Sequence, residues 1–322
     1  MKKFIRFAAA TLVFTGAAVA QQVTVDPSLK LYKPVDGVSG NLNSIGSDTL
    51  NNLMTFWAEG FRKNYPNVVV QVEGKGSSTA PPALIEGTAQ FGPMSRPMKD
   101  EEIEQFEKKY KFKPTEIGVA LDSLAVFVHK DNPVKALSLA QVDAIFSRTR
   151  KGGGSADINI WGDAGVAENG YSALPISLFG RNSASGTYGF FKEHALAKGD
   201  FKDTVKEQPG SASVVMGVSA DRAGIGYSGI GYKTSGVRTV PLSMKDGEPA
   251  YEANMENVLT GKYPLSRMLY IYIAKKPGEP ADPAVAEFIK YILSKEGQEI
   301  TIKDGFYPLP ATVVEEQLKK LD

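Results

Sequence analysis

Short apolar runs rich in β-branched residues alternate along this chain with segments in which apolar residues recur at helical spacing. The clearest helical segment spans residues 50–63, and its apolar face consists of Leu53, Phe56, Trp57 and Phe61. The run at 67–72, which follows Pro66, predicts a strand. This alternation is typical of α/β proteins, in which helices cover a sheet.

The remaining elements follow from the same patterns. Strands are expected at 40–45, 90–92, 119–129, 175–179, 224–232 and 268–274. Helices are expected at 81–87, 100–111, 139–146, 188–196, 211–219, 282–295 and 311–321. Residues 21–37 form a polar, proline-containing leader before the first strand.

Two long apolar strands, 119–129 and 268–274, bracket the middle of the chain. We therefore expect two α/β lobes, with these strands as crossovers and with the C-terminal helices returned to the first lobe. Lobe I then comprises 38–122 together with 268–322, and lobe II comprises 123–267. Ligands of open α/β sheets bind at the carboxyl ends of the strands, so the cleft between the lobes is the expected site.

The first twenty residues have the pattern of a cleavable secretory signal. Lys2, Lys3 and Arg6 precede an apolar stretch at 7–19, and Ala18-Val19-Ala20 offers a cleavage site. The stretch is shorter than the roughly twenty apolar residues that a transmembrane anchor needs. We therefore expect a signal peptide at 1–20 and an exported, soluble mature chain.

Composition narrows the classes of function. The chain has 37 Lys and Arg against 36 Asp and Glu, and loss of the three signal cations leaves a net charge near −2. Nucleic acid and anionic membranes are therefore poor candidates for partners. Since the chain contains no cysteine, disulfides, thiolate chemistry and zinc–thiolate sites are excluded. The only histidines, His129 and His194, are expected to cap or pack, and we expect no metal and no cofactor.

The segment Arg181-Asn-Ser-Ala-Ser-Gly-Thr187 joins a predicted strand to a predicted helix and has the composition of an oxyanion site. Free N–H groups and the dipole of a helix N-terminus favour an anion, and Ser185 and Thr187 add short donors. Gly186 permits close approach of the backbone, and Arg181 supplies a guanidinium that can bind two oxygens. Taken alone, the segment is equally compatible with an N-cap beside a surface arginine.

Similar junctions follow other predicted strands. The first strand is followed by Ser47-Asp48-Thr49, the second by Gly76-Ser77-Ser78-Thr79, and a third by Ser95-Arg96. Helix capping can explain each junction, since Ser, Thr and Asp are preferred N-caps. Because the junctions come from both predicted lobes, a shared anion site is the better interpretation.

Signatures of nucleotide-binding and hydrolytic enzymes are missing or misplaced. The G-x-G-x-x-G match at 224–229 lies in a predicted strand instead of opening a helix, and no Walker P-loop occurs. No G-x-S-x-G elbow accompanies the many serines, and no sequence cluster of Asp and His predicts a metallophosphatase. We therefore expect a binding protein with no catalytic residues.

The ordered set of junctions resembles the periplasmic phosphate-binding proteins, the substrate-binding subunits of Pst-type phosphate ABC importers, and in particular their pseudomonad-like branch. The resemblance covers essentially the whole mature chain and is carried by 44–50 (SIGSDTL), 76–82 (GSSTAPP), 91–98 (FGPMSRPM), 181–188 (RNSASGTY), 208–213 (QPGSAS) and 224–227 (GIGY). It implies the type II periplasmic-binding-protein fold, with two crossover strands as the hinge. It also implies a periplasmic protein, expected to be monomeric, that closes on inorganic phosphate and delivers it to a membrane permease.

Carried over by motif position, the resemblance implies these phosphate ligands: the Thr49 hydroxyl, the Leu50 N–H, Ser77, Arg181, Ser185, Gly186 and Thr187. This chain departs from better-known members, which carry an aspartate acceptor for protonated phosphate where it has Ser95, followed by Arg96. Either Asp48, beside Ser47, takes over that role or selectivity is built differently. Asp48 can alternatively act as the cap of the helix at 50–63. The aspartate that orients the arginine in those members is replaced by Ser183.

Three other functions stay open at this point. The nearest is a binding protein for another tetrahedral oxyanion such as sulfate. The others are a secreted phosphatase and an adhesion protein that acts through the charged segment at 315–320.

Overall fold

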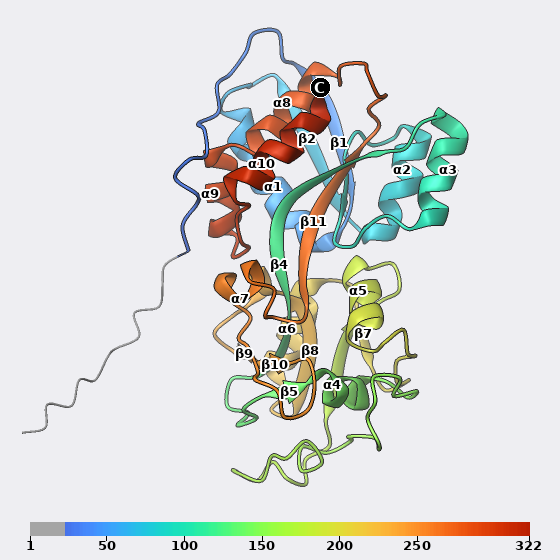
Figure 1. The fold of residues 1–322 in the computed structure, drawn as a ribbon, viewed down its shortest axis with the longest axis vertical. Helices are drawn as coiled ribbons and strands as arrows, with labels where there is room; N and C mark the ends of the chain where they lie inside the picture. The colour runs from blue at the N-terminus through green and yellow to red at the C-terminus, as the bar shows by residue number, and fades with distance from the viewer. Residues whose placement is uncertain (1–22) are drawn as a thin grey trace, which may run out of the picture.

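The computed structural model describes residues 23–322, so the predicted signal peptide lies outside the described residues. Figure 1 shows two α/β lobes, one above the other, joined by strands β4 (Thr115–His129) and β11 (Ser266–Ile273). The C-terminal helices lie in the upper lobe beside the first strands of the chain. The mixed α/β, two-lobed architecture expected from the sequence is confirmed.

The upper lobe, called lobe I, contains the C-terminal end of the chain. Its other elements are β1 (Gly40–Gly46), α1 (Asn51–Arg62), β2 (Val68–Gly74), α2 (Ala80–Glu86), β3 (Gly92–Met94), α3 (Asp100–Tyr110), α8 (Pro283–Ile292), α9 (Lys295–Lys303) and α10 (Ala311–Leu318). The lower lobe, lobe II, contains β5 (Leu137–Ser138), α4 (Leu139–Phe146), β6 (Ser177–Arg181), α5 (Gly186–His194), β7 (Lys206–Gln208), α6 (Ser211–Ala220), β8 (Gly224–Gly229), β9 (Val237–Thr239), β10 (Leu242–Ser243) and α7 (Met255–Leu259).

Strand β4 belongs to both lobes. Its first half pairs antiparallel with β11, and its second half pairs antiparallel with β8 and β9. The sheet that results has the order β3-β11-β4-β8-β6-β7, with β9 also paired to β4. The two predicted crossover strands are therefore direct neighbours, and Asp122 on β4 lies opposite Arg267 on β11.

Two large apolar cores lie toward opposite ends of this strand pair, and a third, smaller cluster packs α2 and α3 against β3. One gathers residues between Leu29 and Ala120 with residues between Leu269 and Leu321. The other gathers residues between Leu124 and Leu265, together with Tyr307. The cores support the predicted division of the chain, and the boundaries at 122/123 and 267/268 stay a prediction.

Helix α1 forms because Leu53, Trp57 and Phe61 recur at helical spacing and are fully buried. The Trp57 indole also donates a 2.8 Å hydrogen bond to the Gly297 carbonyl of α9. Phe56 was expected on the same face, but it is 43% exposed. The buried stripe turns instead toward Met54 and Gly60, which leaves Phe56 on its solvent edge.

Other predicted boundaries shift in ways that matter for the site. The strand expected at 175–179 is β6, which continues to Arg181, so this arginine ends a strand. The strand expected at 224–232 is β8, which ends at Gly229 and passes into a 3-10 turn at Ile230–Tyr232. Gly231 packs so closely that a Cβ there would lie 2.6 Å from the Asp304 carbonyl. Because β8 is a strand, rejection of the dinucleotide fingerprint is confirmed.

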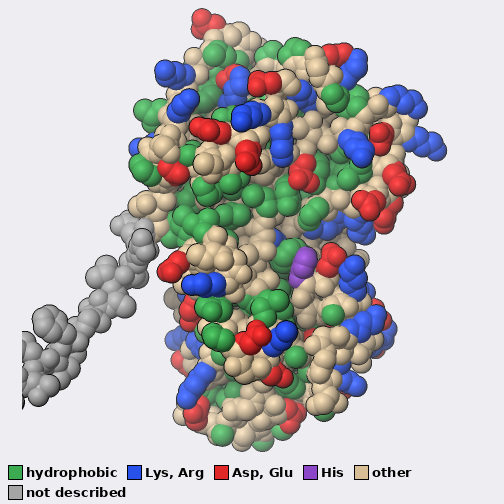
Figure 2. All heavy atoms as spheres, viewed as in Figure 1, with side chains coloured by type: hydrophobic (Ala, Val, Ile, Leu, Met, Phe, Trp, Pro, Cys, Tyr) green, Lys and Arg blue, Asp and Glu red, His purple; other side chains and the backbone are tan. Residues whose placement is uncertain are grey.

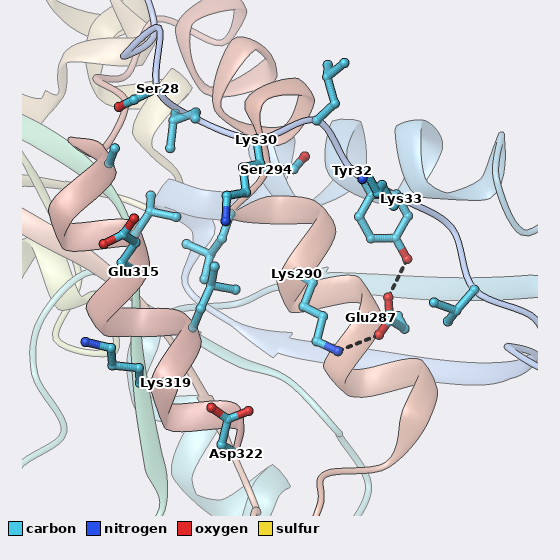
Figure 3. A pocket seen from close by; sticks show the side chains of 17 residues that line it. Ser28, Lys30, Tyr32, Lys33, Glu287, Lys290, Ser294, Glu315, Lys319 and Asp322 are labelled. Carbon is cyan, nitrogen blue, oxygen red and sulfur yellow. Dashed lines mark hydrogen bonds and ion pairs between the residues drawn. The ribbon is translucent and has the colours of Figure 1, made fainter.

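The leader is bound to lobe I. Figure 3 shows Ser28, Lys30, Tyr32 and Lys33 of the leader beside side chains of α8 and α10. The groove that these segments line has a volume of about 740 Å³. The Tyr32 hydroxyl donates to Glu287 at 2.8 Å, and the Tyr32 N–H donates to Glu296 at 2.9 Å. These bonds hold the leader on the C-terminal helices of the lobe.

The outer surface has a mixed charge. Figure 2 shows Lys and Arg interspersed with Asp and Glu over both lobes on the face in view. This mixture agrees with the small net charge of the chain. Among residues 23–322, no helix has the length and apolar character needed to cross a membrane.

Candidate ligand-binding site

The polar junctions of lobe I meet because of strand pairing. Strands β1 and β2 are parallel and in register from Gly40↔Val68 to Gly46↔Gly74, so their carboxyl ends reach the same edge. The Gly76 N–H donates to the Gly46 carbonyl at 2.8 Å, and the Ser47 N–H donates to the Pro93 carbonyl at 2.7 Å. These bonds bring together the segments that follow β1, β2 and β3.

Three serine hydroxyls form the lobe I side of the site. Ser47 Oγ lies 3.1 Å from Ser95 Oγ, and Ser77 Oγ lies 3.3 Å from Ser95 Oγ. The Ser95 N–H also donates to Ser77 Oγ at 3.0 Å. All three residues are buried. The structure thus brings together three predicted site residues that are far apart in the sequence.

Helix α5 brings the lobe II segment against these hydroxyls. Its N-cap, Ser185, accepts hydrogen bonds from the N–H groups of Thr187 at 3.1 Å and Tyr188 at 3.3 Å. The capping role considered from the sequence is therefore confirmed for Ser185. Thr187 Oγ1 lies 2.9 Å from Thr49 Oγ1, so two predicted ligands from opposite lobes are in direct contact.

Glycine is required at position 186 for this approach. A Cβ there would lie 2.2 Å from Ser77 Oγ and 2.6 Å from Ser95 Oγ, both in lobe I. Real Cβ atoms essentially never approach a neighbour so closely. The bare backbone at the start of α5 therefore lets the two lobes come together around the hydroxyls.

Arg181 is 1% exposed and is the last residue of β6 in lobe II. Its Nη1 donates to Ser211 Oγ at 2.7 Å and pairs with Asp48 at 3.0 Å, and its Nη2 donates to the Pro209 carbonyl at 3.3 Å. Its buried Nε has no hydrogen-bond partner among residues 23–322. Burial lowers the pKa of Arg181, and the Asp48 carboxylate opposes that shift. One buried donor of this guanidinium is therefore available to an additional acceptor.

Asp48 connects the lobes. Its Oδ2 pairs with Arg181 and also accepts a 2.8 Å hydrogen bond from the Ser211 N–H, at the first residue of α6. Its backbone carbonyl accepts a 2.9 Å bond from the Tyr232 hydroxyl. The suggestion that Asp48 caps the helix at 50–63 is wrong, because its carboxylate is turned to α6 of lobe II. Whether Asp48 also receives a ligand proton stays a prediction.

Two other predicted ligands have partners of their own. The Leu50 N–H donates to the Ser47 carbonyl at 3.2 Å within the first turn after β1. The Arg96 guanidinium donates to both carboxylate oxygens of Glu102, at 2.8 and 2.7 Å, and to the Pro97 carbonyl. Arg96 therefore lies next to the cluster in sequence, but its charge is paired with the first turn of α3.

The sequence interpretation missed Arg267 and Asp122. They form a buried ion pair of 2.7 Å on the two joining strands, and Arg267 also reaches Thr187. The available signal was a pair of charged residues, one inside the apolar strand predicted at 119–129 and one directly before that at 268–274. A charged residue within a buried strand requires a buried partner of opposite charge. A charged residue in an otherwise apolar predicted strand can therefore be used to search a sequence for buried ion pairs.

The cluster is built to bind an anion. It offers hydroxyls, a helix N-terminus and a buried guanidinium, which are donors suited to oxygen acceptors. The histidines lie elsewhere: His194 packs its ring on Phe190 at 4.2 Å, and His129 accepts from the Asp131 N–H. Within residues 23–322 no group of three or more His, Cys, Asp or Glu could hold a metal ion.

Comparison with known proteins agrees with this geometry. A family model described as "PBP superfamily domain" matches residues 33–296. Phosphate-binding protein PstS of Pseudomonas aeruginosa is 57% identical over 315 residues, which are 98% of this chain and 97% of that protein. A substrate-binding protein assigned to a phosphate ABC transporter of Clostridium perfringens, solved with bound phosphate, has a TM-score of 0.71 at 28% identity and covers 84% of this chain and 100% of its own. An ABC-type phosphate transport receptor of Vibrio cholerae has a TM-score of 0.64 at 21% identity, covering 83% of this chain and 100% of its own, which shows the shared fold.

Proposed function

The chain belongs to the PBP superfamily and, within it, to the PstS family of phosphate-binding proteins, and we propose that it binds inorganic phosphate between its lobes. We propose further that it delivers phosphate to the membrane permease of an ABC importer. The observation that carries the proposal is the contact between the Thr49 and Thr187 hydroxyls of opposite lobes. Arg181, whose buried Nε has no hydrogen-bond partner among residues 23–322, is paired with Asp48, the residue before Thr49.

The chemistry of the cluster suits a tetrahedral oxyanion. Hydroxyls of Ser77 and Ser95 face the start of α5, where Gly186 leaves the backbone open to a close neighbour. A helix N-terminus favours negative charge, and a guanidinium adds directed, charge-assisted hydrogen bonds. We propose the phosphate ligands to be the hydroxyls of Ser47, Thr49, Ser77, Ser95, Ser185 and Thr187, the N–H groups of Leu50 and Gly186, and the guanidinium of Arg181. Arg96 is the weakest member of the predicted set, since Glu102 holds its charge.

The protein acts, in this proposal, as a binding protein and not as an enzyme. The hydroxyl cluster has a buried arginine beside it but neither histidine, so no serine there has an evident imidazole base. The P. aeruginosa relative is named a phosphate-binding protein, and the signal pattern at 1–20 supports action of the mature chain in the periplasm. We propose that it acts there as a monomer.

A second candidate ligand is sulfate or a similar oxyanion. Ser95 stands where better-known members of the family carry an aspartate acceptor, and a serine hydroxyl can donate to a fully ionised oxygen as readily as accept from a protonated one. Rejection of sulfate then depends on the charge balance of the cluster. Asp48 and Asp122 are the carboxylates closest to its two arginines.

Thermal stability in the presence of ligand tests the proposed function. Ligand that binds only the folded state stabilises it by about 2.7 kcal/mol at a hundredfold excess over Kd. Phosphate should therefore raise the melting temperature of phosphate-stripped protein, and solution scattering should show a more compact particle. Saturating phosphate that changes neither quantity would contradict a hinged phosphate-binding protein.

A further inference from the structure

A second buried guanidinium lies at the junction of the lobes. Arg267 Nε donates to Asp122 Oδ2 at 2.8 Å, and its Nη2 lies 2.7 Å from the same oxygen. The two side chains are 2% and 0% exposed. Asp122 on β4 and Arg267 on β11 are paired in the antiparallel register of the two strands. Each is the last residue of a predicted lobe range, 38–122 for Asp122 and 123–267 for Arg267.

The remaining donors of Arg267 reach both lobes. Its Nη1 donates to the Ser95 carbonyl of lobe I at 2.9 Å, and its Nη2 donates to Thr187 Oγ1 of lobe II at 3.0 Å. Asp122 Oδ1 accepts a 3.0 Å bond from the Ile230 N–H, which fixes the other side of the ion pair. One side chain on a joining strand is therefore bonded to both faces of the predicted cleft.

The bond to Thr187 determines the direction in which that hydroxyl can donate. A guanidinium has donors only, so Thr187 Oγ1 must accept from Arg267. A hydroxyl has a single proton, which remains for a neighbour on the other side. That neighbour is Thr49 Oγ1 at 2.9 Å or the oxygen of an anion bound at the start of α5.

Burial of this ion pair is not explained by stability alone. Removing two charges from water is costly, and apolar residues of similar size often serve stability equally well. The pair lies in contact with a predicted ligand and close enough to Arg181 that its positive charge adds, after burial, to the lowering of the Arg181 pKa. Its location therefore points to a role in the site.

We propose that Arg267, held by Asp122, is a positioning residue that fixes the Thr187 hydroxyl as a hydrogen-bond donor to the bound oxyanion. Because Arg267 also holds the Ser95 carbonyl, this arrangement is complete only when the lobes are closed. The proposal rests on the proposed function, since it requires an oxyanion at the N-terminus of α5.

A double-mutant cycle with phosphate as the probe tests the proposal. The variants of the full mature chain are Asp122→Asn with Arg267→Gln, which removes both charges together, Thr187→Val, and the combination of all three substitutions. Arg238→Gln is the matched control, since among residues 23–322 Arg238 donates only to backbone carbonyls, those of Asn132, Val134 and Thr239. Phosphate affinity is measured by calorimetry on phosphate-stripped protein.

We expect the paired variant and Thr187→Val each to weaken phosphate binding roughly tenfold or more, as loss of a charge-assisted hydrogen bond does. The combined variant should bind phosphate no more than about twofold more weakly than Thr187→Val, because the paired substitution and Thr187→Val remove the same interaction with the anion. Thr187→Ser should retain most of the affinity, and Arg238→Gln should leave it unchanged.

Effects that multiply in the combined variant, or wild-type affinity in Thr187→Val, would overturn the proposal. A paired variant that melts at a lower temperature but binds phosphate normally would do the same, because the ion pair would then be structural only. If the paired variant does not fold, Arg267→Lys replaces it, since lysine keeps the charge but cannot bond all three partners at once. Wild-type protein without phosphate affinity would refute the proposed function itself, so the two failures are distinguishable.

Discussion

Replacement of Gly186 with alanine should block closure of the lobes without harming the fold of either one. The new Cβ would lie 2.2 Å from Ser77 Oγ and 2.6 Å from Ser95 Oγ, whereas ordinary contact begins at 3.4 Å. The two lobes must therefore separate by about 1 Å, or the serine hydroxyls must leave their bonds. Overpacking of this kind costs about 1–3 kcal/mol, which corresponds to about 5- to 150-fold in affinity.

The unligated protein should tolerate the same change. Gly186 is the first residue of α5, and alanine in a helix is favoured over glycine by up to about 1 kcal/mol. We therefore expect Gly186→Ala to melt no lower than wild type in the absence of phosphate. Loss of affinity combined with unchanged stability would locate the effect in the closed state.

Calorimetric titration measures the phosphate affinity, and thermal melting without phosphate measures the stability. Solution scattering with phosphate measures closure of the lobes. The matched control is Gly189→Ala in the same helix, where the nearest atom to a new Cβ is Arg96 Cδ at an ordinary 3.4 Å. The control should bind phosphate like wild type. Wild-type affinity in Gly186→Ala would refute the reasoning, because the start of α5 would not need to approach Ser77 and Ser95.

Three further substitutions test the site and its surroundings. Arg181→Ala should lose roughly 1.5–3 kcal/mol of phosphate binding, since a charge-assisted donor is removed, and a titration indistinguishable from wild type would contradict its assignment. Asp48→Asn should raise sulfate affinity relative to phosphate, because a negative charge beside Arg181 is lost; competition binding with an unchanged ratio would remove Asp48 from selectivity. Burial raises the pKa of Asp304 to about 7, so its charged form is penalised above pH 7 and the penalty disappears as pH falls toward 4. Asp304→Asn should therefore stabilise the protein by roughly 1–2 kcal/mol at pH 8, a value discounted for partial solvation, and not at pH 4; equal gains at both values in denaturant titrations would contradict the burial argument.

Local patterns in the sequence were sufficient for most of the fold. Leu53, Trp57 and Phe61 identify α1 because burial follows the helical period. The apolar runs at 119–129 and 268–274 identify the strands that join the lobes. Phe56 was misplaced because the period defines a stripe but not the direction in which its edge turns.

Contacts between distant residues were harder to predict. Hydroxyl-rich junctions predicted that Ser47, Ser77 and Ser95 share a site, since parallel strands end at one edge. Partner choice among charges did not follow from the sequence. Arg96 pairs with Glu102 six residues later, whereas Arg267 pairs with Asp122, 145 positions away, through strand register alone.

The central claim is that the cluster at the start of α5 binds one inorganic phosphate per chain. Calorimetric titration of refolded, phosphate-stripped wild-type protein with phosphate, and in parallel with sulfate and arsenate, tests it most directly. The account predicts saturable binding of one phosphate per chain, with sulfate bound more weakly. Absence of saturable phosphate binding, or tighter binding of sulfate than of phosphate, would contradict it.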